Sequence, residues 1–423
     1  MKSRWTRLLP VMIIAFMIAF MDRTNISFAI PTMGRDLGLT PSQLGFAAGV
    51  LFLGYGSAQL IGGWIADRGH GKLLITVTLV MWGFAEMAQA YVKTADQLAL
   101  VRVVLGLAEG GMFPTFMLFI NNWFSPSEQT RANGIWQICY PLAAMVSGPL
   151  AGVILRVGNW RDLFIVEAIF PLVWVAAWVW GVADSPAKAK WLSASEKLKL
   201  LAHLKKERLS VADLNENSAE DKVTYLSELK RRPLIIFLFA IFFWNLGFLG
   251  FIIWMPSVMA AGGNVSAASV GWLSAVPFLM AIIVMQILPL FVKGTGNLNR
   301  VASSTILISG LSIVLGAAFG GVSIALNIVL LVIAGATLYA SQPPIWSTLN
   351  TIVSKKVAGR IVGTMNASGV IGGFSGSYLV GIARDVTGKF SAGLWVLGGC
   401  LILSSVLFLW VRQSQSLKVP AVA

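Results

Sequence analysis

The chain has 423 residues, of which 57% are hydrophobic and only 12% are charged. Apolar runs of about 20 residues recur along its length, which is typical of a helical membrane protein with many spans and excludes both a soluble domain and a membrane β-barrel. The net charge of +14 does not indicate nucleic acid binding, because the basic residues lie in short loops between the apolar runs.

The N-terminus has the basic flank and apolar stretch of a signal peptide, but no cleavage site of small residues follows it. We therefore expect an uncleaved first membrane span. The two cysteines, Cys139 and Cys400, both fall inside apolar runs. Neither a disulfide framework nor a metal cluster is expected from them.

The apolar runs predict twelve membrane helices, six on each side of one long polar stretch. They cover residues 8–31, 44–66, 73–92, 97–123, 132–155, 162–182, 234–260, 267–292, 301–320, 323–347, 361–383 and 390–411. We expect a domain at 1–183, a linker at 184–232 and a second domain at 233–423. In the linker, Ser193 and Glu196 form a capping-box pattern before an amphipathic run, which predicts a surface helix.

Most of the 32 Lys and Arg residues fall on one side of the membrane if the N-terminus is cytoplasmic. The positive-inside rule then places both termini and the linker in the cytoplasm. We expect a multi-pass protein of the cell (inner) membrane. The segments 125–134 and 354–363 share Ser, Arg and Gly at identical spacing, each after the fourth span of its half. This internal echo predicts two pseudo-symmetric halves of six helices each.

The predicted spans of the first half contain ionisable residues, whereas those of the second half contain none. Away from the ends of the spans, they are Asp22, Arg23, Glu86, Arg102, Glu109 and Glu167. Charges within a bilayer are costly, so such residues are expected to face the bundle interior and to serve function. For Glu86 and Glu167 we favour a structural ion pair or an interface position.

Arg102 and Glu109 are seven residues apart, so they share one helix face at a separation of about 10 Å. Gly106 lies between them and is expected to leave room for the first helix or for a ligand. Asp22 and Glu109 reach a similar depth near the membrane midplane. We therefore expect Asp22, Arg23, Arg102 and Glu109 to share one cavity.

This set of charges predicts anion binding coupled to protonation. The guanidinium of arginine offers a fixed fork that matches a carboxylate. A carboxylic acid that is removed from water is hard to ionise and can exchange a proton near neutral pH. The hypothesis is that an organic anion and a proton enter together.

The second half supplies neutral polar residues. Gln342 and Trp346 are four residues apart and share a helix face, and the adjacent Pro343 and Pro344 predict a local helix break. Glycine-rich segments at 147–152 and 369–376 predict close helix packing.

Several motifs resemble the major facilitator superfamily across nearly the whole chain. GGWIADRGHGK at 62–72 and RVVLGLAEGG at 102–111 match its general pattern. MDRTNISFA in the first span, DSPAKAKWL after the sixth and TGKFSAGLW near the end are similar to its anion:cation symporter family of bacterial organic-acid permeases.

The resemblance implies alternating access without a cofactor, with protons as the coupling ion. Asp22 and Glu109 would take up protons, while Arg23, supported by Arg102, would engage the substrate carboxylate. The expected substrate contacts also include Tyr55, Gln137, Tyr140, Gln342, Trp346 and Asn366. The motifs assign a cytoplasmic gate to Asp67, Arg68, Lys72, Arg131 and Arg360.

The gate motif departs from the family pattern in two places. His70 stands where the pattern has glycine, and the corresponding loop of the second half, LFVKGTGNLNR, lacks the Asp-Arg pair. The glycine motif of drug:proton antiporters is also incomplete, since only Gly148 and Pro149 remain of it. Drug export is therefore disfavoured.

Proton-independent exchange or export of organic anions remains an alternative, because the same arginines would serve it. The only histidines, His70 and His203, lie in polar segments, so no catalytic set indicates an enzyme. A membrane sensor is a further alternative. We expect a monomer whose partners are a small organic anion, protons and lipid, with no nucleic acid.

Overall fold

The computed structural model describes residues 4–216, 224–261, 266–291, 297–319, 323–354 and 357–411. Within these ranges all regular secondary structure is helical, which confirms the predicted fold class. Part of the predicted linker, at 217–223, and the chain beyond residue 411 lie outside the described residues.

The first half runs from residue 4 to residue 181 and consists of η1 (Arg4–Leu8), α1 (Leu9–Leu37), α2 (Pro41–Ile65), η2 (Ala66–His70), α3 (Gly71–Gln89), α4 (Ala95–Glu109), α5 (Met112–Trp123), α6 (Pro126–Gln137), α7 (Cys139–Val157) and α8 (Trp160–Gly181). The connecting segment contains η3 (Pro186–Lys188) and α9 (Ala194–Glu216).

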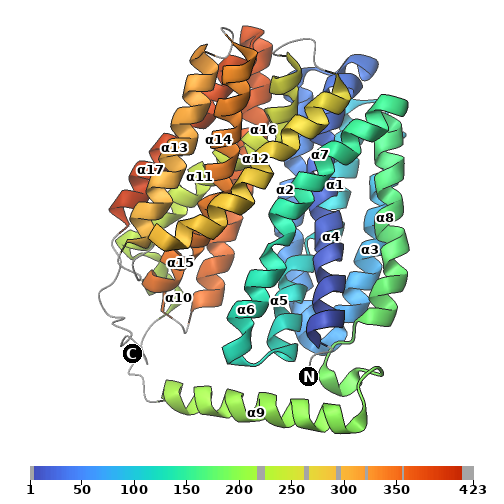
Figure 1. The fold of residues 1–423 in the computed structure, drawn as a ribbon, viewed down its shortest axis with the longest axis vertical. Coiled ribbons are helices and arrows are strands. Elements are labelled where there is room, and N and C mark those ends of the chain that lie inside the picture. Colours follow the sequence, from blue (N-terminus) through green and yellow to red (C-terminus); the bar gives the residue numbers. More distant parts are fainter. Residues whose placement is uncertain are drawn as a thin grey trace.

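The second half runs from residue 224 to residue 410. It consists of α10 (Tyr225–Leu229), α11 (Arg232–Ala261), α12 (Ala267–Ile287), η4 (Leu288–Phe291), α13 (Leu298–Phe319), α14 (Ile324–Ala340), α15 (Gln342–Ile352), α16 (Ala358–Thr387) and α17 (Phe390–Trp410). Figure 1 shows the two halves side by side, with α9 and the N-terminus at one end of the molecule. We call this end the linker end and the opposite one the far end.

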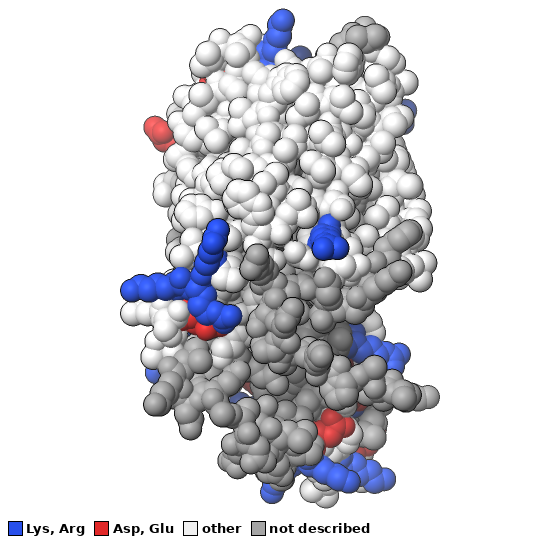
Figure 2. All heavy atoms as spheres, turned by 90° about the vertical axis from the view of Figure 1, so that its left-hand side faces the viewer, with Lys and Arg blue, Asp and Glu red and all other residues white. Residues whose placement is uncertain are grey.

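Each of the twelve predicted spans corresponds to one helix or to two consecutive helices. Ten stretches of the described chain are long and apolar enough to cross a membrane. One of these, Pro41–Gln89, contains two spans, because Gly69 adopts a φ of 79° and turns the chain between α2 and α3. The glycine-rich α16, 30 residues long, adds the remaining span. On the face in Figure 2, the part toward the far end is almost entirely uncharged, as lipid contact requires.

Several predicted spans fell short of their helices by four residues or more at an end. Helix α1 continues to Leu37, α6 begins at Pro126, and α16 ends at Thr387. Hydropathy marks only the apolar part of a helix, whereas backbone hydrogen bonding continues until a cap ends it. Here Gly38 and Gly388 end α1 and α16 in the left-handed region, with φ of 63° and 71°.

Three spans are broken into consecutive helices. Helices α4 and α5 separate at Gly110 and Gly111, directly after Glu109, and α6 and α7 separate at Ile138. The predicted break near Pro343 is confirmed, because α14 ends at Ala340 and α15 places its prolines in its first turn. Proline fits there because no backbone N–H is required of it.

The two halves are joined by two helix pairs, α2 with α16 and α7 with α12. Each pair combines the second span of one half with the fifth span of the other, as expected for a duplicated fold. Glycine permits the close approach: a Cβ atom added to Gly148 would collide with the backbone carbonyl of Gly271, and one added to Gly271 would collide with that of Gly148. This confirms the predicted packing role of the 147–152 segment.

We expect Gly148→Ala to force α7 and α12 apart, because backbone atoms cannot move aside as a flexible side chain can. The free energy of unfolding should fall by about 1–3 kcal/mol, measurable as a lower melting temperature of the purified protein. Gly399→Ala is the matched control, since nothing lies within 4 Å of a Cβ added there. Equal melting temperatures for the two variants would contradict this packing.

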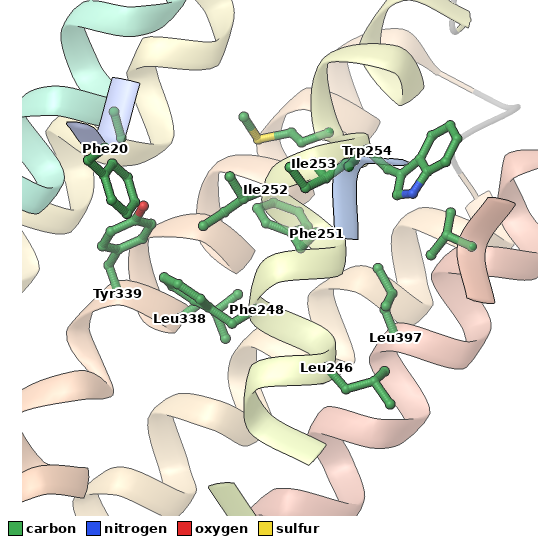
Figure 3. Packing of buried hydrophobic residues seen from close by; sticks show 14 of the residues in the cluster. Phe20, Leu246, Phe248, Phe251, Ile252, Ile253, Trp254, Leu338, Tyr339 and Leu397 are labelled. Carbon is green, nitrogen blue, oxygen red and sulfur yellow. The ribbon is translucent and has the colours of Figure 1, made fainter. Parts of the chain in front are cut away.

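Helix α11 forms the centre of the second half. Figure 3 shows Phe248, Phe251 and Ile252 projecting from it into the core. Figure 3 also shows Phe20, from α1 of the first half, beside Tyr339 at the end of α14. The halves therefore meet through aromatic side chains near the middle of the molecule.

Helix α9 confirms the predicted linker helix. Its start is fixed by the capping box, in which the amide of Glu196 donates to Ser193 Oγ at 3.2 Å and the amide of Ser193 donates to Glu196 Oε2 at 3.1 Å. The helix crosses the linker end (Figure 1).

Helix α9 and the segment before it are attached to the first half. Ser127 Oγ, on α6, donates a hydrogen bond of 2.7 Å to Glu207 Oε2 on α9. This bond is the main reason why the pKa of the Glu207 carboxyl is lowered. Ahead of α9, the ring of Trp191 stacks on Trp123 at the end of α5, with centroids 5.2 Å apart.

Candidate functional site

The six ionisable residues predicted within the first-half spans all point into the bundle. None is more than 5% exposed, and they are Asp22, Arg23, Glu86, Arg102, Glu109 and Glu167. They come from α1, α3, α4 and α8. Their burial fits the expectation that charges within the membrane avoid lipid.

Arg23 and Glu109 form a direct ion pair between α1 and α4. Arg23 Nε lies 2.5 Å from Glu109 Oε2. The guanidinium carbon of Arg23 lies 4.2 Å from the ring centroid of Tyr55 and 5.3 Å from that of Phe16. Arg23 Nη2 and Glu109 Oε1 are buried and have no hydrogen-bond partner in the described structure. The pair therefore keeps one free donor group and one free acceptor for another ligand.

Arg102 is bound mainly to the backbone. Its Nη atoms donate to the carbonyl oxygens of Asp22 at 3.3 Å, Arg23 at 3.2 Å and Ala48 at 3.5 Å, and to Gln89 Oε1 at 3.5 Å. These bonds tie α4 to the backbones of α1 and α2. The predicted direct contact of Arg102 with a substrate stays a prediction.

The space at Gly106 is filled by α2. A Cβ atom added to Gly106 would meet the carbonyl oxygen of Leu51 and the amide nitrogen of Tyr55. The expectation that this glycine admits the first helix or a ligand was wrong. Its function is to let α2 approach α4, which brings the Tyr55 ring against Arg23.

Asp22 belongs to a different group from the Arg23–Glu109 pair. Its Oδ2 accepts a hydrogen bond of 2.5 Å from Trp82 Nε1. Carboxylate oxygens of Asp22, Glu86 and Glu167 lie within 4.8 Å of one another. The expectation that Asp22, Arg23, Arg102 and Glu109 share one cavity stays a prediction, and Asp22 lies in addition close to Glu86 and Glu167.

Glu86 and Glu167 are bridged by Asn25. Its Nδ2 donates to Glu86 Oε1 and to Glu167 Oε2, each at 2.6 Å, and Gln89 Nε2 donates to Glu86 Oε2 at 2.6 Å. Neither glutamate forms an ion pair with a described cation. Of the two favoured interpretations, the structural ion pair is therefore not formed among the described residues, whereas the interface position stays a prediction.

The sequence interpretation missed Asn25, Trp82 and Gln89. Asn25 follows Asp22 by three residues, so helical spacing alone would have placed it on the same face. Gln89 follows Glu86 by three residues in the same way. For Trp82 no such signal exists, because tryptophans are frequent throughout this chain.

Among the predicted substrate contacts of the first half, Tyr55 and Tyr140 lie close enough to Arg23 to interact with it electrostatically. Tyr140 also packs edge-on against Phe20, with centroids 5.3 Å apart. Gln137 is exposed at the end of α6.

In the second half, Gln342, Trp346 and Asn366 are half-buried. Sequence reasoning missed one residue of this half, Tyr339. It interacts electrostatically with Tyr140, and its buried hydroxyl has no partner in the described structure. No signal in its apolar surroundings distinguishes it.

A small cavity lies where α1, α7, α11 and α12 meet. It is lined by Thr24, Ser27, Phe28, Ala144, Ser147, Ile252, Met255, Pro256 and Phe278, and its size of about 10 Å³ suits one water molecule. Ser147 Oγ, on its wall, has no partner in the described structure. The cavity is too small for an organic anion.

The predicted gate residues lie at the linker end without bridging the halves. The guanidinium carbon of Arg68 lies 3.3 Å from the ring centroid of Trp64. The guanidinium carbon of Arg131 lies 5.1 Å from the ring centroid of Trp5. Arg360 is exposed. Within the described residues none of these three side chains bonds to the other half.

The remaining gate residues also stay within the first half. Lys72 Nζ donates to the carbonyl oxygen of Val179 at 2.5 Å, and its amide donates to Asp184 Oδ1 at 2.7 Å. Asp67 is exposed. The gate function of all five residues stays a prediction.

At the far end a contact between the halves is present. The amide of Ser42, at the start of α2, donates to Asp385 Oδ2, near the end of α16, at 2.9 Å. The backbone of Ser377 on α16 also lies against Gly45. The halves are thus in contact at the far end.

Comparison with known proteins places this geometry in a family. The model of the Major Facilitator Superfamily matches residues 12–377. A putative tartrate transporter of Agrobacterium vitis is 27% identical, over 97% of this chain and 90% of that protein. A quinolone resistance transporter of Acinetobacter baumannii is also 27% identical, over 95% of this chain and 92% of that protein.

The fold agrees with a solved structure. That of a D-xylose-proton symporter superposes with a TM-score of 0.77 at 14% sequence identity, covering 96% of this chain and 98% of the other. The family model matches most of the chain. The twelve spans in two halves and the charges buried within one half are consistent with that match. The chain belongs to the Major Facilitator Superfamily and is a multi-pass membrane transporter, not an enzyme.

Proposed function

We propose that the protein is a proton-coupled symporter that imports a small organic carboxylate across the inner membrane by alternating access. The observation that carries the proposal is the buried Arg23–Glu109 pair with one unused donor group and one unused acceptor. A substrate carboxylate matches the guanidinium fork of Arg23 and would compete with Glu109 for it.

The pair couples the two ligands through charge. If an anion replaces Glu109 on Arg23, the glutamate is left buried without a partner, which is strongly unfavourable while it is ionised. A proton on Glu109 removes that cost. Anion binding and proton binding therefore favour each other, which is what symport requires.

The substrate class is supported by the site and by one relative. The Tyr55 ring against Arg23, with Tyr140 and Tyr339 near it, offers hydroxyl groups and apolar ring faces to a small hydroxy acid, sugar acid or aromatic acid. The similarity to a protein named as a putative tartrate transporter supports a hydroxy acid. We infer that the linker end is cytoplasmic, that the conformation is open there, and that the protein is a monomer.

Uptake into proteoliposomes tests the proposal. With labelled tartrate as the probe, and a panel of sugar acids and aromatic acids beside it, we expect accumulation when the outside is acidified and no accumulation after addition of a protonophore. Uptake of any of these anions that ignores the imposed pH gradient would refute proton coupling.

Proton-independent exchange or export is the second candidate. It is supported by the same buried Arg23, because a guanidinium can bind an organic anion without any coupled proton. Stimulation of uptake by substrate on the inside, without any response to a protonophore, would support exchange over symport.

A further inference from the structure

Three buried carboxyl groups of the first half lack a cationic partner. Asp22, Glu86 and Glu167 are each 0% exposed, and one oxygen from each lies within 4.8 Å of the others. They come from α1, α3 and α8. No described Lys, Arg or His forms an ion pair with any of them.

The neighbouring charges do not balance this cluster. Arg102 is the only described cation near it that is not already paired, and its hydrogen bonds go to backbone carbonyls and to Gln89. Arg23 is neutralised by Glu109. Three carboxylates against one guanidinium would leave two negative charges buried in the bilayer, which is untenable without protons or a cation.

The polar contacts of the cluster favour protons over a cation. Every group that donates to it is neutral: Trp82 donates to Asp22, Asn25 to both glutamates, and Gln89 to Glu86. A cation would need oxygen ligands, whereas the Asn25 amide nitrogen occupies the position between the two glutamates.

A second observation shows that the cluster is incomplete as it stands. Asn25 is 0% exposed and bridges the two glutamates through Nδ2, yet its Oδ1 has no partner in the described structure. Asp22 Oδ1 and Glu167 Oε1 are unpaired as well. Buried acceptors are rarely left unpaired, and a proton on Asp22 or Glu167 would supply a donor that the cluster lacks.

We propose that Asp22, Glu86 and Glu167 form a proton-binding site separate from Glu109, which holds two protons and releases one in each transport cycle. Around it, α1 presents Asp22 and Arg23, α3 presents Glu86, α4 presents Arg102 and Glu109, and α8 presents Glu167. Two protons are needed because three carboxylates, offset only by the guanidinium of Arg102, leave two negative charges. The release of one rests on the proposed proton coupling.

The location of the cluster gives it a function in that coupling. Glu86 lies three residues before the end of α3, and Glu167 lies seven residues after the start of α8, so both are nearer the far end. Asp22 is the neighbour of Arg23 in the chain. A proton that enters from the far end would pass from the glutamates to Asp22 and reach the Arg23–Glu109 pair without crossing the interface between the halves.

The first test needs no substrate. Infrared spectra of the purified protein at neutral pH should contain carboxylic acid bands that are lost in Glu86→Gln and in Glu167→Gln and retained in Asp96→Asn, which changes an exposed acid of the same half. Unchanged bands in both glutamine variants would overturn the site. Loss of the wild-type bands on addition of sodium or calcium would also overturn it, because a metal ion would then be the ligand.

The second test measures the ratio of protons to substrate from reversal potentials in proteoliposomes, with labelled tartrate as the probe. We expect two protons per anion in the wild type and in Asp96→Asn, and one in Glu86→Gln or Glu167→Gln. One proton per anion in the wild type would overturn proton release from the cluster while leaving symport intact. No response to pH at all would instead refute the proposed function, and the infrared result would stand by itself.

Discussion

Arg23→Ala should abolish substrate binding. The substitution removes the buried guanidinium fork that is proposed to hold the carboxylate, and hydrogen bonds to charged groups are worth about 1.5–3 kcal/mol each. Loss of two such bonds corresponds to a reduction in affinity of at least a hundredfold. Isothermal titration calorimetry or thermal shift with the transported anion would measure it.

Two further variants separate binding from folding. Arg23→Lys keeps the charge near Glu109 but loses the planar fork, so we expect a folded protein with affinity between that of the wild type and that of Arg23→Ala. Arg161→Ala removes an arginine whose ion pair with Asp36 is exposed, and should bind normally. If folded Arg23→Ala bound the anion within threefold of the wild type, the proposed anchor would be wrong.

Glu109→Gln should abolish proton-driven accumulation while exchange of substrate across the membrane remains measurable. The amide has nearly the shape of the protonated acid but cannot release a proton, so the anion can bind Arg23 at any pH. We therefore expect the affinity to lose its dependence on pH, and an imposed pH gradient to drive no net uptake.

Asp36→Asn is the matched control for this variant, because Asp36 is an exposed acid that pairs with Arg161. It should accumulate substrate as the wild type does. Full accumulation by Glu109→Gln would show that the coupling proton resides elsewhere, and the cluster around Asp22 would be the first place to test.

Much of the fold could be predicted from the sequence because each membrane helix is marked by the hydropathy of its own consecutive residues. A run of apolar residues between polar loops leaves few alternatives to a membrane helix, so the number and order of the spans emerge. The positions of helix ends and helix breaks are harder to predict from the sequence. Thr40, Ser125 and Asn159 cap helices from polar sequence, where hydropathy gives no signal.

The site was predictable only in part, for a related reason. Helical spacing places Arg102 and Glu109 on one face, but it does not say which other helix they meet. Arg23 pairs with Glu109, while its neighbour Asp22 turns toward Glu86 on α3 and Glu167 on α8. Contacts between helices depend on packing in three dimensions, as at Gly106, where a missing side chain admits α2.

The attachment of α9 has a consequence for measuring motion. Glu207 and Trp191 tie the linker segment to α6 and α5, so α9 would move together with the first half when the halves rock. A pair of spectroscopic labels on α9 and α15 would then report the opening angle, whereas a pair on α9 and α6 would give a constant distance. A label on α9, outside the membrane, would thus report the rotation of the first half within the membrane.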